Sequence, residues 1–414
     1  MKVFKFGGAS VRHAAAIRQV ASIIKLYRED KILIVVSAMG KTTNALERVV
    51  ACIQSGGDFR ADLLLIRSYH EDVMRELFQQ DHRVWHLVNR EFESLLSRLK
   101  LEMAPDQLYD QVVSTGEMLS SIIVAELLLA EGLPVEWMDA RTYITTNNTY
   151  REGKVDWGAT EKNTQPLKSM LDEKIILTQG FIGKGPEGYT TTLGREGSDY
   201  SAAIFAACMG AESVTIWKDV PGVMNADPKR LSDAVVFDEL PFREAAEMTY
   251  YGASVIHPKT IKPLANKNIP LFVKNFDDPS LPGTIIHETK IDHIRPLIVF
   301  KDNQCLVSCR VTDYTFINEQ QLSFIFNALA ELDSKINVMQ NSAISFSFCI
   351  DFREDKILKL VDRLAKQFEV YYNTGLTLIT IKNYDSKLSE QYRKMPGIIL
   401  EQSSRSTLQI LVKS

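Results

Sequence analysis

The sequence has 414 residues, more than a single hydrophobic core usually serves, so we expect two or three domains. Hydrophobic residues make up 45% and charged residues 24%, as in ordinary globular proteins. The net charge of −4 gives no electrostatic footprint for nucleic acid or a membrane surface. We find no apolar run of about 20 residues, the length that spans a bilayer, and no signal peptide. We therefore expect a cytoplasmic protein that binds neither nucleic acid nor membrane.

Strand-like and helix-like segments alternate through residues 1–290. The continuous apolar run at 32–36 is typical of a strand covered on both faces, and further strand-like runs lie at 3–6, 174–178 and 213–217. Helical or glycine-rich sequence separates these runs. This rhythm predicts a three-layer α/β sandwich with a largely parallel sheet. Ligands of such folds bind at the carboxyl ends of the strands.

The pattern changes after the turn-rich stretch 278–283, where we expect a domain boundary. Residues 291–374 follow a βαββαβ order, which predicts a small split-βαβ unit. A second unit of this kind begins at 375 and stops at 414, short of a full repeat. The predicted domains are therefore 1–290, 291–374 and a short 375–414.

A pair of glycines, Gly7 and Gly8, directly follows the first strand and precedes Ser10. Glycines let backbone N–H groups approach a phosphate without a Cβ atom in the way, and the following helix offers a positive N-terminus. Lys5 adds a point charge that can follow a migrating phosphoryl group. Taken alone, a Gly-Gly turn between strand and helix is more often only a turn.

Residues 190–201 form a second polar segment, directly before an apolar helix. Ser198 and Asp199 would lie at the mouth of that helix, which predicts a second phosphate or carboxylate site, although Asp199 also suits a simple helix cap. Arg195 offers a bidentate fork for a carboxylate. A third segment, 217–229, is rich in turn residues and suits a nucleotide-lining loop or any surface loop.

Two other segments imitate nucleotide motifs. Residues 37–42 look like the end of a P-loop, but the earlier glycine position is Val35, inside a strand. Residues 183–188 match G-x-G-x-x-G, but no helix opens there and Pro186 disrupts the turn. We therefore expect neither a Walker-type site nor a dinucleotide site, and interpret 183–188 as a hairpin-like loop.

These segments resemble the aspartate kinase branch of the amino acid kinase family. Order and spacing agree over residues 1–290, with further matches at 36–44, 114–117, 180–183 and 247–258. The units after 291 resemble the tandem ACT regulatory domains of that family. The resemblance implies the amino acid kinase fold followed by small ferredoxin-like ACT units.

The resemblance implies phosphoryl transfer from ATP to L-aspartate, the first step of lysine, threonine and methionine biosynthesis. It implies Mg²⁺ held mainly through the ATP phosphates, without a metal site made by the protein. The implied catalytic residues are Lys5, Gly8 and Asp199. The implied substrate-binding residues are Ser37, Thr43, Glu117, Arg195 and Ser198. The implied ATP-binding residues are Lys5, Gly7, Gly8, Ser10, Lys218, Asp219, Met224 and Lys229.

The chain departs from the family pattern in several places. Glu196 stands at a position that is often glycine, and Ser254 stands where a lysine commonly reaches ATP. Lys259, five residues on, is a candidate replacement for that lysine. The loop 312–318 lacks the glycine usual in the first ACT unit. We expect a homodimer through the ACT-like domains, with weakened or altered feedback by lysine or threonine.

Two other functions remain open at this point. The first is another amino acid kinase, such as a glutamate or uridylate kinase, which Glu117 and Arg195 disfavour. The second is a catalytically weakened amino acid sensor, in which the kinase half is a scaffold. Ser254 and Glu196 favour the sensor, whereas the retained Lys5, Arg195 and Asp199 argue against it.

Overall fold

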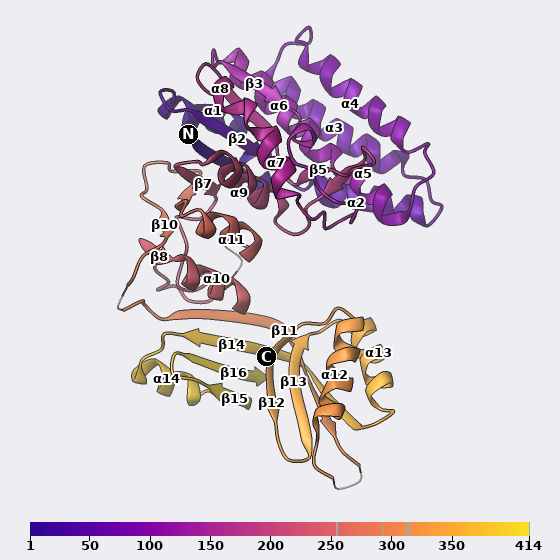
Figure 1. Ribbon diagram of the computed structural model, residues 1–414, viewed down its shortest axis with the longest axis vertical. Coiled ribbons are helices and arrows are strands. Elements are labelled where there is room, and N and C mark those ends of the chain that lie inside the picture. The colour runs from indigo at the N-terminus through magenta and orange to yellow at the C-terminus, as the bar shows by residue number, and fades with distance from the viewer. Residues whose placement is uncertain (254–255, 292, 313–314, 414) are drawn as a thin grey trace. The chain divides into compact units, whose positions relative to one another are not determined.

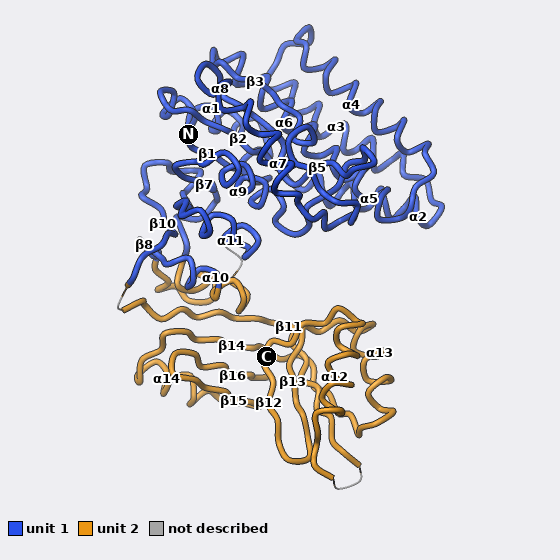
Figure 2. The backbone as a smooth tube through the Cα atoms, in the orientation of Figure 1, with its two compact units in different colours: residues 1–223, 236–246, 254–290 blue, residues 224–235, 247–253, 291–414 orange. Residues whose placement is uncertain are grey.

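The computed structural model describes residues 1–253, 256–291, 293–312 and 315–413. The chain forms two compact units whose sequences interleave (Figure 2). Unit 1 consists of residues 1–223, 236–246 and 254–290, and unit 2 of residues 224–235, 247–253 and 291–414. Unit 1 thus holds most of the predicted first domain, and unit 2 holds both smaller ones.

Unit 1 is built on an eight-stranded sheet with the strand order β3-β4-β2-β1-β7-β9-β10-β8 (Figure 1). Neighbouring strands are parallel, except that β10 runs antiparallel to β9. The prediction of a largely parallel sheet is confirmed. The strands are β1 (Lys2–Phe6), β2 (Ile32–Val36), β3 (Val135–Met138), β4 (Ile175–Gln179), β7 (Ser213–Lys218), β8 (Glu239–Pro241), β9 (Leu271–Asn275) and β10 (Thr284–His287).

Helices cover both faces of this sheet, because alternate side chains of its central strands are buried on opposite sides. Phe4 and Phe6 point into the core that α1 (Ala14–Leu26) and α6 (Thr115–Ala130) close. Val3 is fully buried on the other face, where α9 (Gly197–Met209) packs against β1, β2 and β7. Further helices of the chain are α2 (Thr42–Gln54), α3 (Arg60–Leu77), α4 (Val84–Arg98), α5 (Pro105–Val113), α7 (Trp157–Thr164), α8 (Pro166–Met170), α10 (Phe242–Tyr251) and α11 (Pro258–Asn266).

One helical stretch, Pro105–Ala130, is long and apolar enough to cross a membrane by length and composition alone. It comprises α5 and α6, and 89% of its most apolar window is buried inside the protein. This is the environment of a core helix. Polar side chains such as Asp110 and Glu117 interrupt the stretch, so the sequence shows no continuous apolar run there.

A small antiparallel hairpin joins β4 to α9. Its strands are β5 (Ile182–Lys184) and β6 (Thr190–Thr192), with Ile182 opposite Thr192. The hairpin-like loop predicted for residues 183–188 is confirmed. Asp110 and Gln111 of α5 hold β6 through buried hydrogen bonds, considered with the site below.

Unit 2 contains a six-stranded antiparallel sheet with the order β12-β13-β11-β14-β16-β15 (Figure 1). Its long strands β11 (Leu297–Arg310) and β14 (Glu369–Lys382) run through both halves of the sheet, and their register shifts between Lys301 and Leu306. The remaining elements are α12 (Glu319–Glu331), β12 (Ile336–Asn341), β13 (Ser345–Asp351), α13 (Glu354–Leu364), α14 (Ser386–Arg393), β15 (Ile398–Ser403) and β16 (Thr407–Lys413).

The two halves of this sheet resemble each other. One half has the order β12-β13-β11-β14 and the other has β15-β16-β14-β11, so each long strand is the first strand of one half and the last of the other. The segment 375–414 looked short of a full repeat in the sequence. In the structure, residues 297–301 of β11 pair with residues 378–382 of β14 and supply its missing strand.

Candidate active site

Paired glycines and the loop after β2 approach each other closely at the carboxyl edge of the sheet. The Gly40 N–H donates to the Gly8 carbonyl oxygen at 3.0 Å. A Cβ atom on Gly8 would lie 2.8 Å from the Ala38 carbonyl oxygen and 2.9 Å from that of Gly40. Position 8 therefore requires glycine because the two backbones touch.

Lys5 and Lys218 flank the carboxylate of Asp199. The Lys5 Nζ atom lies 2.6 Å from Asp199 Oδ1, and the Lys218 Nζ atom lies 3.8 Å from Oδ2. Only 4% of the Asp199 side chain is exposed. Burial alone would raise the pKa of this carboxyl, but the two ammonium groups hold the pKa of Asp199 below its usual value. Asp199 is therefore ionised and organises both lysines.

Glu117, in the first turn of α6, is a buried carboxylate with spare hydrogen-bonding capacity. Its Oε1 atom accepts from the Ala38 N–H at 3.2 Å. Its Oε2 atom is buried and has no hydrogen-bond partner among the described residues. Burial raises the pKa of Glu117 to about 8, an effect that the Ala38 N–H and the charge of Lys5 partly offset. Such a carboxylate suits a cationic ligand group that supplies the missing partner.

Ser37 and Thr43 lie on the segment that joins β2 to α2. The Ser37 N–H donates to the Phe6 carbonyl oxygen at 3.1 Å, and the Ser37 carbonyl oxygen accepts from Ser120 Oγ at 2.7 Å. Thr43 is half-buried in the first turn of α2. The segment therefore links β1 to α6. Ser37 directly precedes Ala38, whose N–H donates to Glu117.

Gly180 holds the end of β4 against the start of α9. Its N–H donates to the Val36 carbonyl oxygen at 2.9 Å. A Cβ atom on Gly180 would lie 2.5 Å from the Cβ atom of Ser198 and 2.7 Å from its Oγ atom. The position of Ser198, and with it that of Asp199, depends on this contact.

Replacing Gly180 with alanine is expected to displace the start of α9, since the added methyl group would overlap Ser198. We expect a loss of about 2 kcal/mol in the free energy of unfolding, the usual result of overpacking, together with reduced turnover. Urea denaturation and steady-state kinetics measure both. Gly158→Ala is the control, because its Cβ atom would meet its nearest neighbour at 3.7 Å. Equal stability of the two variants would contradict the prediction.

The loop before α9 places Arg195 and Glu196 in different surroundings. Arg195 is exposed, and no acidic side chain in the described part of the chain pairs with it. Glu196 has φ of +53°, in the left-handed region that favours glycine. Its Oε2 atom is buried without a hydrogen-bond partner among the described residues. This backbone conformation explains why glycine suits this position.

Replacing Glu196 with glycine is expected to raise the free energy of unfolding by about 1 kcal/mol, because the left-handed conformation is strained for any residue with a Cβ atom. Chemical denaturation of the two proteins is the measurement. The matched control is Asn268→Gly, at another left-handed position with φ of +52°. A less stable Glu196→Gly protein would show that the carboxylate stabilises the loop.

Asp110 and Gln111 of α5 support the site, although sequence reasoning did not single them out. Asp110 accepts from the Thr192 N–H at 2.8 Å and from Thr192 Oγ1 at 2.7 Å. Gln111 donates to the Thr190 carbonyl oxygen at 2.8 Å. Burial raises the pKa of Asp110 to about 6, and the hydrogen bonds from the Arg151 N–H and from Thr192 oppose the rise. The available sequence signal was a pair of polar residues in an apolar helix, just before Ser114.

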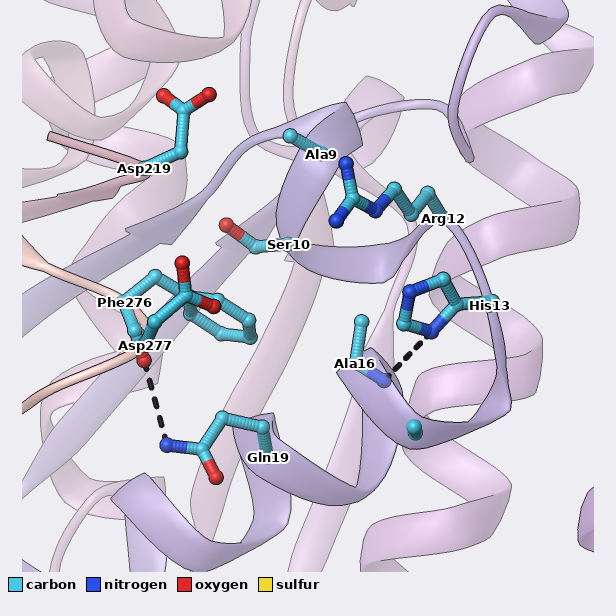
Figure 3. Close-up of a pocket in the computed structure, with 10 residues that line it drawn as sticks. Ala9, Ser10, Arg12, His13, Ala16, Gln19, Asp219, Phe276 and Asp277 are labelled. Atoms are coloured by element: carbon cyan, nitrogen blue, oxygen red, sulfur yellow. Dashed lines mark hydrogen bonds between the residues drawn. The ribbon is translucent and has the colours of Figure 1, made fainter.

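A cavity of about 250 Å³ lies where β1, β7 and β9 end (Figure 3). Ser10 and Asp219, both predicted to bind ATP, line it together with Asp277. Gln19 crosses its lower end in this view, donating from Nε2 to the Phe276 carbonyl oxygen at 3.3 Å. The cavity therefore brings two of the predicted nucleotide residues together, at the edge where parallel sheets bind their ligands.

The remaining predicted residues lie elsewhere. Met224 and Lys229 belong to unit 2, so their place beside a nucleotide stays a prediction. Ser254 lies outside the described residues. Lys259 stands in the first turn of α11, and its Nζ atom lies 3.9 Å from Glu152 Oε1.

Comparisons with known proteins identify the family of the chain. The amino acid kinase family matches residues 1–275. The lysine-sensitive aspartokinase 3 of Escherichia coli is 33% identical over 92% of the chain and 87% of its own length. The crystal structure of E. coli aspartokinase III in complex with aspartate and ADP superposes with a TM-score of 0.84 at 29% identity, covering 100% of this chain and 96% of that one.

A longer relative is similar too. The bifunctional aspartokinase/homoserine dehydrogenase 2 of Arabidopsis thaliana is 31% identical over 96% of the chain, which spans only 45% of that protein. The chain thus covers less than half of the bifunctional relative and 87% of the E. coli aspartokinase. From the family match and this similarity, the chain belongs to the amino acid kinase family, within its aspartokinase branch.

Proposed function

We propose that this chain is an aspartate kinase, which transfers the γ-phosphoryl group of ATP to the side-chain carboxylate of L-aspartate. One observation carries the proposal: Glu117, a buried glutamate with an oxygen that has no hydrogen-bond partner among the described residues, lies close enough to the Lys5–Asp199–Lys218 cluster for the charge of Lys5 to lower its pKa. The first feature suits the α-ammonium group of an amino acid. The second suits the oxygens of a transferring phosphoryl group.

In the proposed reaction an oxygen of the aspartate side chain forms a bond to Pγ. The bond from Pγ to the β–γ bridging oxygen breaks, and its electron pair leaves with ADP. The attacking carboxylate is already ionised at neutral pH, so the step requires no strong general base. The barrier comes from repulsion between anions and from alignment of the reactants. Cationic side chains address the first, and binding of both ends of aspartate addresses the second.

Individual residues take the following roles in this proposal. Glu117 binds the α-ammonium group and Arg195 the α-carboxylate, and Ser37, Thr43 and Ser198 complete the amino acid pocket. Lys5, Gly7, Gly8 and Ser10 hold the phosphates that react. Asp199 keeps the lysines in position, and Asp219, Met224 and Lys229 line the nucleotide site together with Lys218.

Mg²⁺ would enter with the nucleotide. Among the described residues no group of three or more His, Cys, Asp or Glu side chains gathers as a metal site, and Asp199 is already paired with lysines. Lysines around Asp199 suit phosphate oxygens, so we infer an ion that is held by those oxygens and by water, as Mg²⁺ prefers near ATP. Bound there, the ion would offset charge on the phosphates.

Regulation and assembly are further parts of the proposal. The E. coli relative is named lysine-sensitive, and the antiparallel sheet of unit 2 has the order of paired ACT units. We infer lysine as the first effector to test and threonine as the second. We infer a homodimer through unit 2, activity in the cytoplasm, and a place in lysine and threonine biosynthesis.

The test is ATP-dependent formation of an acyl-hydroxamate when hydroxylamine traps the product. We expect a signal with aspartate and Mg²⁺, little with glutamate, and no ATP turnover with UMP. Lys5→Ala should abolish it. Lysine and threonine are added separately to measure feedback. An inactive wild-type protein that still binds lysine would favour the amino acid sensor instead.

A further inference from the structure

A cavity of about 520 Å³ lies among three helices of unit 1. Both α7 and α11 pack against α9, and these helices, with the residue that directly follows α11, supply its lining (Figure 1). The cavity shares no described residue with the one at the ends of β1, β7 and β9. None of the residues that the proposed reaction uses lines it. Its volume is in the range of small-molecule sites.

Part of the lining is aromatic and apolar. The rings of Trp157 and Tyr200 meet edge to face, with their centroids 6.4 Å apart and their planes at 67°. Trp157 is 40% exposed, so one face of a large ring remains open to a ligand. Cys208 and Pro263 are buried beside these rings in the lining of the cavity. Such walls suit a flat apolar group, because aromatic rings stack or pack edge to face.

Three lysines line the cavity from α11 and its C-terminal end. Lys259 and Lys262 stand three residues apart, so they share a helix face, where like charges repel each other. The Lys259 Nζ atom lies 3.9 Å from Glu152 Oε1, which partly offsets its charge. Lys262 and Lys267 form no ion pair within the described part of the chain. An anion in the cavity would relieve the repulsion between these ammonium groups.

Glu161 is the one acidic side chain among the described residues that line the cavity. Burial raises the pKa of the Cys208 thiol to about 11, the charge of Glu161 adds to this rise, and Lys267 opposes it. The thiol is therefore uncharged at neutral pH, and both charged groups lie close enough to act on it. The cavity thus combines an apolar floor with an excess of cations over anions.

We propose that this cavity binds a small organic anion that carries a flat ring, an aromatic carboxylate or phosphate. The ring lies against Trp157 and Tyr200, and the anionic group faces Lys262 and Lys267. A neutral ring would leave the ammonium groups unbalanced, and a bare anion would leave the aromatic wall uncovered, so one ligand with both features fits best. This inference goes beyond the proposed function and does not depend on it.

The first experiment titrates the full chain with two probes, 1-naphthyl phosphate and 1-naphthoate, by calorimetry. We expect at least one of them to bind with Kd below about 1 mM. Uncharged 1-naphthol and inorganic phosphate should each bind at least about tenfold more weakly, because each lacks one of the two features. Tighter binding of the first probe would assign a phosphate ligand, and tighter binding of the second a carboxylate. Failure of both probes, or equal binding of 1-naphthol, would overturn the inference.

The second experiment places the probe in this cavity by removing its cations. The double variant Lys262→Gln/Lys267→Gln should weaken the tighter probe about tenfold, since two charge contacts are lost. The matched control is Lys162→Gln/Lys168→Gln, which removes the same charge from exposed positions on α7 and α8 outside the cavity lining. The control should bind as wild type. Equal affinity of the two double variants would overturn the inference.

The third experiment removes the aromatic wall. Trp157→Ala should weaken the tighter probe about tenfold, whereas Trp157→Phe, which keeps a ring, should retain most of the affinity. Trp157 is the first residue of α7 and is partly exposed, so the melting temperature should change little in either variant. Unchanged binding in folded Trp157→Ala would show that the ring contributes nothing and would overturn the inference.

Discussion

Replacing Glu117 with glutamine is expected to lower kcat/KM for aspartate by about 100-fold, the effect of removing one partner of a buried charge pair. Glutamine keeps the shape and can accept the Ala38 N–H bond, but it offers no negative charge to the ammonium group. The buried Oε2 atom, which lacks a partner among the described residues, is the atom whose charge is lost. Steady-state kinetics at pH 8 measure the change.

The same substitution is expected to stabilise the protein. The pKa of Glu117 is raised from 4.5 to about 8 on folding, chiefly by burial. Between these values the unfolded chain releases a proton that the folded chain keeps, so rising pH lowers the stability of wild type. Glutamine has no such proton, and its advantage should be on the order of 3 kcal/mol at pH 7. Denaturation at pH 5 and at pH 8 should show that the difference in the free energy of unfolding between the variant and wild type is larger at pH 8.

Substrate binding should reverse this titration. An ammonium group beside Glu117 favours the carboxylate, so aspartate binding near pH 7 releases a proton, and the affinity rises toward pH 8. Calorimetry in buffers of different ionisation enthalpy measures the proton. Glu126→Gln is the matched control: Glu126 lies on the same helix but accepts from Arg83 at 2.7 and 2.8 Å. A wild-type protein that releases no proton would contradict the raised pKa.

Local sequence predicted backbone shapes at the site, and the resemblance to a family supplied the roles of its residues. The strand before Gly7 and Gly8 and the turn before Ser198 set backbone shapes that neighbouring residues determine. Parallel strands bring Lys5 of β1 and Lys218 of β7 together at their carboxyl ends, and Asp199 reaches both lysines from the first turn of α9. The resemblance to a family supplied the role of Glu117. The raised pKa of that residue was not predictable, because it depends on how completely α6 is buried.

Other features depend on contacts between distant segments. Asp110 and Thr192 are 82 residues apart in the chain, and neither local sequence predicts the hydrogen bonds between them. The second half of the sheet in unit 2 is completed by residues 297–301, from before the first half. The order of elements in the sequence predicts an incomplete repeat at 375–414, because the strand that completes it precedes the first half. Only the strand pairing shows that the missing strand comes earlier.

Replacing Lys5 with methionine is expected to lower kcat about 1000-fold, because it removes a cation at the reacting phosphate. It should also lower the free energy of unfolding by about 3 kcal/mol, since it leaves Asp199 buried with Lys218 alone, at 3.8 Å. Kinetics and urea denaturation measure the two effects. Lys25→Met is the control, because Lys25 pairs with Glu131 on the surface.

A double variant separates these two roles of Lys5. Adding Asp199→Asn to Lys5→Met removes the uncompensated charge, so most of the lost stability should return. Activity should not return, because neither the cation nor the group that positions Lys218 is present. If activity recovered with stability, Lys5 would act by holding the fold alone. Recovery of stability without activity would show that the Asp199 carboxylate serves to pair with the lysines. It would also show that the lysines are needed in catalysis for their charge beside the phosphate.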